Sequence, residues 1–221
     1  MKDWLEGDPA QPPPPATRRS GRNAEWKYLY NRDVLSMPDT WEYPWYAAWD
    51  LAFHMLPFAR IDPHFAKEQL VLLLREWYMR PNGQIPAYEW AFGDVNPPVH
   101  AWAAWRVYKL DRAQGERDRR LPERVFQKLL HQLHLVGEPQ GPRGQATSSR
   151  AASSGSTTSA CSTARRRCRT GGYLEQADGT AWMAFYCGTM LSIALELASE
   201  DPAYEDVASS SSSTTSPSPT P

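Results

Sequence analysis

The sequence predicts an all-α fold built from helical hairpins. Apolar residues recur at helical spacing in several stretches, no stretch alternates like a β-strand, and prolines stand where helices would begin. The clearest case follows Asp62-Pro63, an N-cap and a first-turn proline, after which apolar residues recur at helical spacing from Phe65 to Trp77. Repeated hairpins with functional loops at one end are typical of an (α/α) toroid.

The first expected hairpin lies between residues 44 and 81. Its first helix runs from Trp45 to Arg60, with Pro44 in the first turn. The second helix follows Asp62 and stops at the turn-forming residues 81–83, Pro-Asn-Gly. A tight turn between the two helices makes them antiparallel.

Three more helices follow the first hairpin. The pair Pro97-Pro98 opens one of them, and Pro122 opens another that ends near Leu130. A last long helix reaches Glu200, with Asp178 or Thr180 as its N-cap. The chain therefore holds about three hairpins.

Composition excludes several classes of function. The net charge of −1 over 221 residues gives no electrostatic reason to bind nucleic acid or a membrane surface, and no 18 consecutive residues are all apolar. The three cysteines, Cys161, Cys168 and Cys187, form no metal-binding pattern, so we expect no metal and no cofactor. Their odd number and the absence of a secretory signal at the start predict a cytoplasmic protein.

Changes in composition divide the chain into five parts. Residues 1–24 are a proline-rich connector, and residues 25–136 and 172–207 are helical segments of the toroid. Residues 137–171 and 208–221 are rich in serine and threonine and almost free of large apolar residues, which predicts a disordered insert and tail. A flexible insert of this length between two packed helices is unusual.

Other reading frames turn the low-complexity stretches into protein-like sequence. Codons can be chosen for residues 131–144 so that the frame one nucleotide later reads INFTWWVNRKDPE, and the tail can likewise read FFEHYLAIADA. Codons for residues 147–169 can also be chosen so that another frame reads as protein-like sequence. We therefore hypothesise single-base insertions or deletions in the gene. The nucleotide sequence from codon 130 to beyond codon 221 tests this, and a confirmed serine-rich frame would leave a true insert and tail.

One stretch, residues 31–54, combines aromatic and acidic side chains. Asp50 stands between Trp49 and Leu51 in an apolar run, where a carboxylate is unfavourable unless it is paired or used. Burial raises the pKa of a carboxyl group, which suits a proton donor, and flat aromatic rings suit the C–H faces of a sugar. The alternative is a buried aspartate that caps a helix or pairs with an arginine. The other aromatic and acidic residues of the stretch are Asp33, Asp39, Trp41, Glu42, Tyr43, Trp45, Tyr46 and Phe53.

A long irregular loop, residues 84–97, carries a similar mixture of side chains. Loops of this length inside a compact domain are usually functional. The alternative is a packed Ω-loop whose polar groups satisfy its own backbone. His100, just after the loop, is a candidate for a substrate contact, although a lone histidine on a helix is more often a core or surface residue. The polar and aromatic residues of the loop are Tyr88, Glu89, Trp90, Asp94 and Asn96.

The segment Trp49-Asp50-x-x-Phe53-His54 resembles the W-D-x-x-F-H motif of glycoside hydrolase family 63, which includes processing α-glucosidase I and is related to the mannosylglycerate hydrolases. The similarity continues through residues 83–105 and 173–186. It implies six helical hairpins, an inverting mechanism and Asp50 as the general acid. The general base of this family is a glutamate much nearer the C-terminus of the toroid, and no segment of this chain matches it.

The resemblance therefore predicts an incomplete (α/α)6 toroid that is inactive alone. We expect a glycosidase that acts on α-glucosides or related oligosaccharides, whose partner is the remainder of the same catalytic domain. The alternatives are a non-catalytic carbohydrate-binding remnant and a helical scaffold. The residues expected to contact the sugar are Trp45, Trp49, Phe53, His54, Tyr88, Glu89, Trp90, Asn96, Glu175 and Asp178.

Overall fold

The computed structural model describes residues 6–20, 23–24, 26–37, 39–81, 83–90, 92, 96–137 and 177–213, without the side chains of 131–137, 177–180 and 210–213. These residues form seven helices and no strand element, so the all-α prediction is confirmed for them. Most of the predicted insert, from residue 138 on, and the end of the tail, from residue 214 on, lie outside the described residues.

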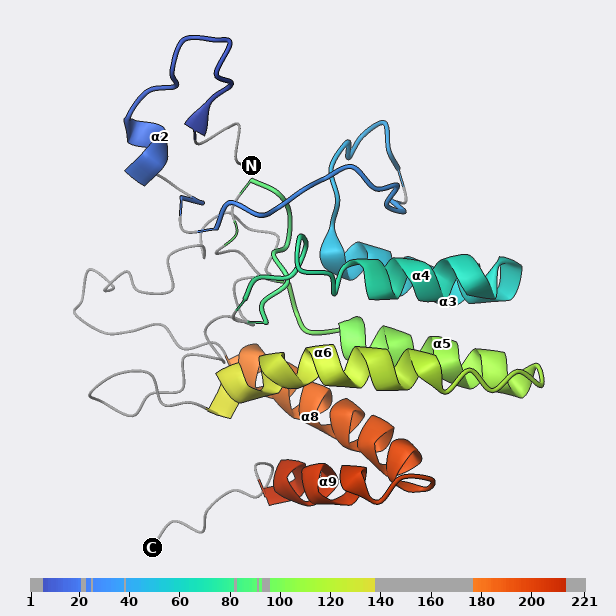
Figure 1. The fold of residues 1–221 in the computed structure, drawn as a ribbon. Helices are drawn as coiled ribbons and strands as arrows, with labels where there is room; N and C mark the ends of the chain where they lie inside the picture. The colour runs from blue at the N-terminus through green and yellow to red at the C-terminus, as the bar shows by residue number, and fades with distance from the viewer. Residues whose placement is uncertain are drawn as a thin grey trace, which may run out of the picture.

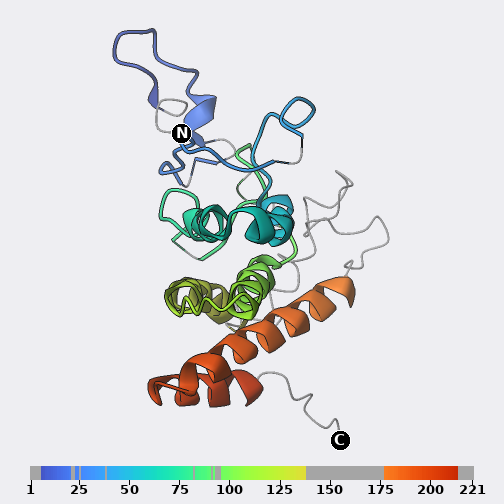
Figure 2. The same cartoon turned by 90° about the vertical axis from the view of Figure 1, so that its right-hand side faces the viewer.

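The helices pair into three stacked hairpins (Figure 1). Each hairpin packs on the next, which gives three successive layers in the end view (Figure 2). The helices α3, α5 and α8 all begin at the same end of the stack. The pairs are α3 (Ala48–Ile61) with α4 (Pro63–Leu72), α5 (His100–Ala113) with α6 (Arg120–Gly137), and α8 (Ala177–Ala198) with α9 (Ala203–Ser213); a short helix, α2 (Thr17–Ser20), lies in the proline-rich segment.

The first hairpin confirms one predicted boundary and corrects two. Asp62 caps α4, since its Oδ1 accepts a hydrogen bond from the Phe65 amide at 2.9 Å. However, α3 begins at Ala48 instead of Trp45, because the Ala48 amide donates to the Ala87 carbonyl of the following loop at 3.2 Å. The helix α4 ends at Leu72, well before the predicted stop, and tight turns occupy residues 73–79.

The later helices also differ from the predicted boundaries. The helix α5 begins at His100, two residues after its proline pair, and α6 begins at Arg120. The predicted caps of the last long helix are wrong, because α8 already begins at Ala177 and both Asp178 and Thr180 lie within its first turn. The helix α9 continues to Ser213, past the boundary that composition placed at residue 207.

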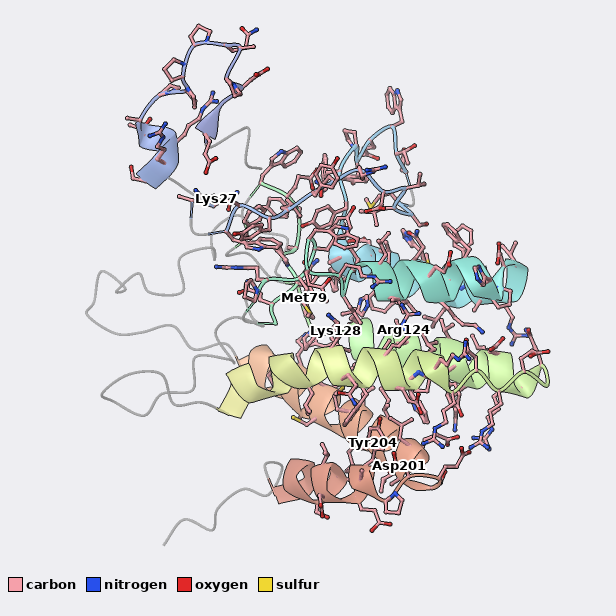
Figure 3. All side chains as sticks on the ribbon, viewed as in Figure 1. Lys27, Met79, Arg124, Lys128, Asp201 and Tyr204 are labelled. Carbon is pink, nitrogen blue, oxygen red and sulfur yellow. The ribbon has the colours of Figure 1, made fainter. Side chains whose placement is uncertain are left out.

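A continuous apolar core joins the three hairpins, and aromatic side chains tie its layers together. The hydroxyl of Tyr186 on α8 donates to the carbonyl of Leu129 on α6 at 2.7 Å. On α9, Tyr204, labelled in Figure 3, packs edge-on against Phe126 of α6 with 5.6 Å between ring centroids. These contacts span 57 and 78 residues of sequence, so the third hairpin is an integral part of the core.

His100 belongs to this core and not to a substrate site. Its Nε2 lies 2.7 Å from the carbonyl of Leu70, and burial lowers the pKa of its imidazole to about 4. The ring is therefore neutral near pH 7, and Nε2 carries the proton that the carbonyl accepts. The structure confirms the core alternative for this residue.

Ion pairs gather at the other end of the stack, where α3, α5 and α8 finish. The buried carboxylate of Asp111 accepts a hydrogen bond from the Lys67 ammonium at 2.7 Å, and Asp118 lies 3.1 Å from the same ammonium. Glu196 on α8 pairs with Arg112 in the last turn of α5 and with Arg117 in the connection from α5 to α6. Ion pairs thus connect the ends of α5 and α8 and the middle of α4 at this end of the stack.

The helix α8 is apolar around most of its circumference. One stretch of the described chain, Ala181–Ala198, has a mean hydropathy of 1.4, long and apolar enough by composition alone to cross a membrane. One face of α8 packs against α5, α6 and α9, and 44% of the stretch is buried. Packing against these helices accounts for the apolar residues on the buried face of α8. Phe185 and Leu195 lie outside that face and remain exposed.

Candidate active site

Asp50 lies in the first turn of α3, half-buried, at the end of the stack where α3, α5 and α8 begin. The unpaired amides and the dipole of a helix N-terminus favour a carboxylate at this position. Among the described residues, none forms a hydrogen bond or ion pair with the Asp50 carboxylate. The structure therefore gives no support to the alternative in which Asp50 pairs with an arginine.

His54 follows Asp50 by four residues and so shares its face of α3. Burial lowers the pKa of the His54 imidazole, although the Asp50 carboxylate and a backbone hydrogen bond at Ser36 act in the opposite direction. A neutral imidazole beside the carboxylate can accept or donate a hydrogen bond without adding charge. The structure thus places this predicted sugar-binding residue next to Asp50.

A row of aromatic rings crosses the beginnings of α3, α5 and α8. It consists of Trp49, Phe53, Trp102, Phe185 and Trp182, and we call it the aromatic row. Successive ring centroids lie 6.0, 5.5, 6.4 and 6.0 Å apart. Phe53 is 41% exposed, so the row is open to solvent near its centre. Rings at the same end as Asp50 provide flat faces on which a sugar can stack.

The prediction from sequence missed three members of this row, namely Trp102, Phe185 and Trp182. A signal was present, because each lies within the first nine residues of a helix that begins at the Asp50 end. Equivalent positions of successive parallel helices meet when the helices pack side by side. The sequence alone did not show that α5 and α8 run parallel to α3.

A second group of rings, which we call the loop cluster, joins the segment before α3 to the loop after α4. It consists of Tyr43, Trp45, Trp90 and Tyr88. The Trp45 ring lies 5.3 Å from Trp90 and 5.3 Å from Tyr43, and Trp90 lies 6.1 Å from Tyr88. Trp90 is 51% exposed. The hydrogen bond from the Ala48 amide to the Ala87 carbonyl holds this cluster against the first turn of α3.

Glu89 stands between Tyr88 and Trp90 in the sequence of the loop, and its side chain is half-buried. Burial raises the pKa of Glu89, and backbone hydrogen bonds from the Glu89 and Tyr46 amides oppose that shift. Its Oε2 and the Tyr46 hydroxyl are both buried without a hydrogen-bond partner among the described residues. Burial and the Glu89 charge raise the pKa of Tyr46, so its hydroxyl keeps its proton at all ordinary pH values.

We expect Tyr46→Phe to raise the melting temperature of the ligand-free chain slightly. A buried hydroxyl without a partner has lost its hydrogen bonds to water and gained none in the protein. Its removal should therefore raise the free energy of unfolding by up to about 1 kcal/mol. The matched control is Tyr78→Phe, because the Tyr78 hydroxyl donates to Asp33 at 3.2 Å and its removal lowers stability. Thermal unfolding of both variants checks the pair, and a destabilised Tyr46→Phe would mean that its hydroxyl has a partner in solution.

The remaining predicted site residues are only partly placed. Asn96 is half-buried at the end of the loop, with no hydrogen bond to another described side chain. Asp178 lies in the first turn of α8, at the correct end of the stack, but its side chain is outside the described residues, as are Asp94 and Glu175 entirely. No group of three or more metal-ligating side chains comes together within the described part of the chain.

Comparison with known proteins shows the family of the chain. Residues 43–214 match the family described as the mannosylglycerate hydrolase MGH1-like glycoside hydrolase domain. The chain belongs to this family. The MGH1-like domain thus includes Asp50, the aromatic row and the loop cluster, and begins at Tyr43, the first ring of that cluster.

The chain is also similar to a longer yeast protein. It is 54% identical over 208 residues to the uncharacterized protein YMR196W of Saccharomyces cerevisiae. That alignment covers 93% of this chain but 19% of the yeast protein, so the chain spans about a fifth of the length of its relative. No solved structure matches the chain.

Proposed function

We propose that the chain carries the general-acid half of an inverting glycosidase site for α-glucosides or related oligosaccharides. The observation that carries this proposal is the Asp50 carboxylate in the first turn of α3. It has no hydrogen-bond or ion-pair partner among the described residues, and aromatic rings lie on its own helix and on the adjoining loop. Membership of a glycoside hydrolase family supports a carbohydrate substrate.

In the proposed reaction, the Asp50 carboxylic acid gives its proton to the glycosidic oxygen as the bond from that oxygen to the anomeric carbon breaks. A water molecule attacks the anomeric carbon from the opposite face, and a general base takes the proton that this water loses. Inverting enzymes hold these two carboxyl groups roughly 6.5–9.5 Å apart to leave room for the water. The family resemblance implies a glutamate base, which we assign to protein outside this chain.

The helical stack supports a toroid as the complete form of the domain. The helices α3, α5 and α8 form one row, and α4, α6 and α9 form a second row beside it. The exposed Leu195 leaves part of α8 uncovered, away from the aromatic row. We propose that a further hairpin of the same domain packs on this face, because exposed apolar patches generally mark contact surfaces. Six hairpins would close the row into an (α/α)6 toroid.

We expect Trp90→Ala to weaken glycan binding by the chain more than it lowers its melting temperature. Trp90 is half-exposed and contributes little core packing, so its loss removes a stacking face and little stability. Isothermal calorimetry with neutral α-linked gluco-oligosaccharides, beside thermal unfolding, checks both effects.

The control for this test is Trp26→Ala. Trp26 is buried against Phe92, with 5.1 Å between ring centroids, so its truncation removes core packing and destabilises the chain by about 3–5 kcal/mol. If Trp90→Ala only unfolds the chain, and binding per folded molecule stays unchanged, then Trp90 has a packing role and the loop cluster is not a sugar site.

A second candidate function is carbohydrate binding without catalysis. The exposed rings of the loop cluster favour it, because aromatic faces can stack on a sugar without a catalytic pair of carboxyl groups. Turnover discriminates between the two functions: a binding remnant retains the Trp90-dependent affinity and hydrolyses nothing even when the rest of the domain is supplied.

A further inference from the structure

We infer that Trp41 is a stacking platform for a sugar ring beyond the one that is cleaved, so that the site selects oligosaccharides of several rings. This inference rests on the proposed function. It deepens that function by naming the class of substrate.

The backbone around Trp41 is held in a defined turn. The Asp39 Oδ1 accepts hydrogen bonds from the amides of Trp41 at 2.9 Å and Glu42 at 3.1 Å, and the Asp39 carbonyl accepts one from Tyr43 at 3.0 Å. Such an Asx turn fixes the local chain by side-chain hydrogen bonds. The indole is therefore presented from an ordered turn, which reduces the entropy lost when a ligand binds.

The Trp41 side chain has no packing role in the described structure. It is 92% exposed, and its indole takes part in none of the aromatic contacts of the described residues. Hydrophobic side chains usually contribute to stability by burial, which this residue does not do. The segment that carries this turn arches away from the helices beside the start of α3 (Figures 1 and 2).

Trp41 lies two residues before Tyr43, the first ring of the loop cluster. The rings of Tyr43, Trp45 and Trp90 lead from this segment to the loop after α4, and Tyr43 follows Trp41 by two residues. Tyr43 and Trp90 are themselves partly exposed. The exposed side chain of Trp41 is thus attached to the same segment as the rings of Tyr43 and Trp45, and we infer that together they follow successive rings of one glycan.

Charge on this path favours a neutral ligand. The exposed acids Asp39 and Glu42 flank Trp41, and Glu89 lies beside Trp90. Carboxylates repel an anionic ligand and accept hydrogen bonds from sugar hydroxyls. A neutral oligosaccharide fits this path better than an acidic glycoside or a phosphorylated ligand.

The test measures how affinity depends on glycan length. Calorimetry on the 221-residue chain compares neutral α-linked gluco-oligosaccharides of two to six rings for the unchanged chain, Trp41→Ala and Asp39→Ala. We expect both variants to bind the longest glycans about three- to tenfold more weakly and the two-ring glycan within a factor of two of the unchanged chain. Trp41→Tyr should restore most of the affinity.

The matched control is Tyr28→Ala, which truncates another exposed aromatic side chain (73% exposed) outside both ring groups and should leave all affinities unchanged. Equal loss at every glycan length, or no loss at any length while Trp90→Ala still weakens binding, overturns the inference alone. A change of oligomeric state on Trp41→Ala, seen by size-exclusion chromatography, would also overturn it, because Trp41 would then contact a second copy. Absence of glycan binding by the unchanged folded chain overturns the proposed function as well.

Discussion

Replacing Asp50 by asparagine should lower glycoside hydrolysis by about two to four orders of magnitude, the usual contribution of a general acid. The measurement needs a complete domain. A suitable protein is a chimera of the yeast relative in which this chain replaces the matching segment of 208 residues. Because asparagine cannot give a proton to the leaving oxygen, substrates with poor leaving groups should lose the most turnover.

The fold should survive this substitution. Asp50 forms no hydrogen bond or ion pair with a described residue, so asparagine removes no internal contact. Asp62→Asn is the matched control, because asparagine caps a helix about as well as aspartate and Asp62 lies at the far end of α3. Near-normal hydrolysis of an unactivated disaccharide by the Asp50 variant would contradict its role as the acid.

Lys67→Met should lower the free energy of unfolding by about 3–5 kcal/mol, because it leaves a buried carboxylate without its partner. Asp111 is only 3% exposed, and the Lys67 ammonium lies 2.7 Å from it. The control is Lys128→Met. Lys128, labelled in Figure 3, pairs with the exposed Glu76, and an exposed pair contributes at most about 1 kcal/mol. Urea unfolding of the two variants measures the difference, and equal losses would contradict a structural role for the buried pair.

The same pair predicts a dependence of stability on alkaline pH. Burial acts to lower the pKa of Lys67, but hydrogen bonds to Asp111 and Asp118 outweigh it and raise the pKa above the ordinary value. The stabilisation is therefore complete below the ordinary lysine pKa and is lost as the pH rises through the raised pKa. Urea unfolding above pH 10 should show this loss in the unchanged chain and not in Lys67→Met.

Local sequence signals predicted those elements whose ends depend on local contacts. Asp62-Pro63 marks the start of α4 because the cap is a hydrogen bond between residues three apart. The start of α3 was placed three residues early because its position depends on a bond to Ala87, almost forty residues away. A pattern read within a short window contains no information about such a contact.

The same distinction applies to the candidate site. The motif around Asp50 and the loop around Trp90 were predicted from sequence, and the structure brings them together through Trp45. The contribution of α5 and α8 to the aromatic row was not predicted, because it depends on how three hairpins stack. The roles assigned to Asp50 and to the sugar-binding residues remain predictions.

The burial of the Tyr46 hydroxyl and Glu89 Oε2, which have no hydrogen-bond partner among the described residues, could not have been predicted from sequence either. Tyrosine and glutamate are ordinary residues in a loop, and only the fold shows that both polar atoms are buried together. Groups of this kind usually have a partner in a folded protein, so two of them in the segments that carry the loop cluster add to the case for a functional site there.

The stereochemistry of the released sugar tests the central claim most directly. Proton NMR can follow hydrolysis of an α-glucoside by the chimera from its first minutes, before the anomers interconvert. We predict that the β-anomer appears first, because water attacks from the face opposite the Asp50 proton donor. Initial release of the α-anomer, or no hydrolysis by a correctly folded chimera, would contradict an inverting site built on Asp50.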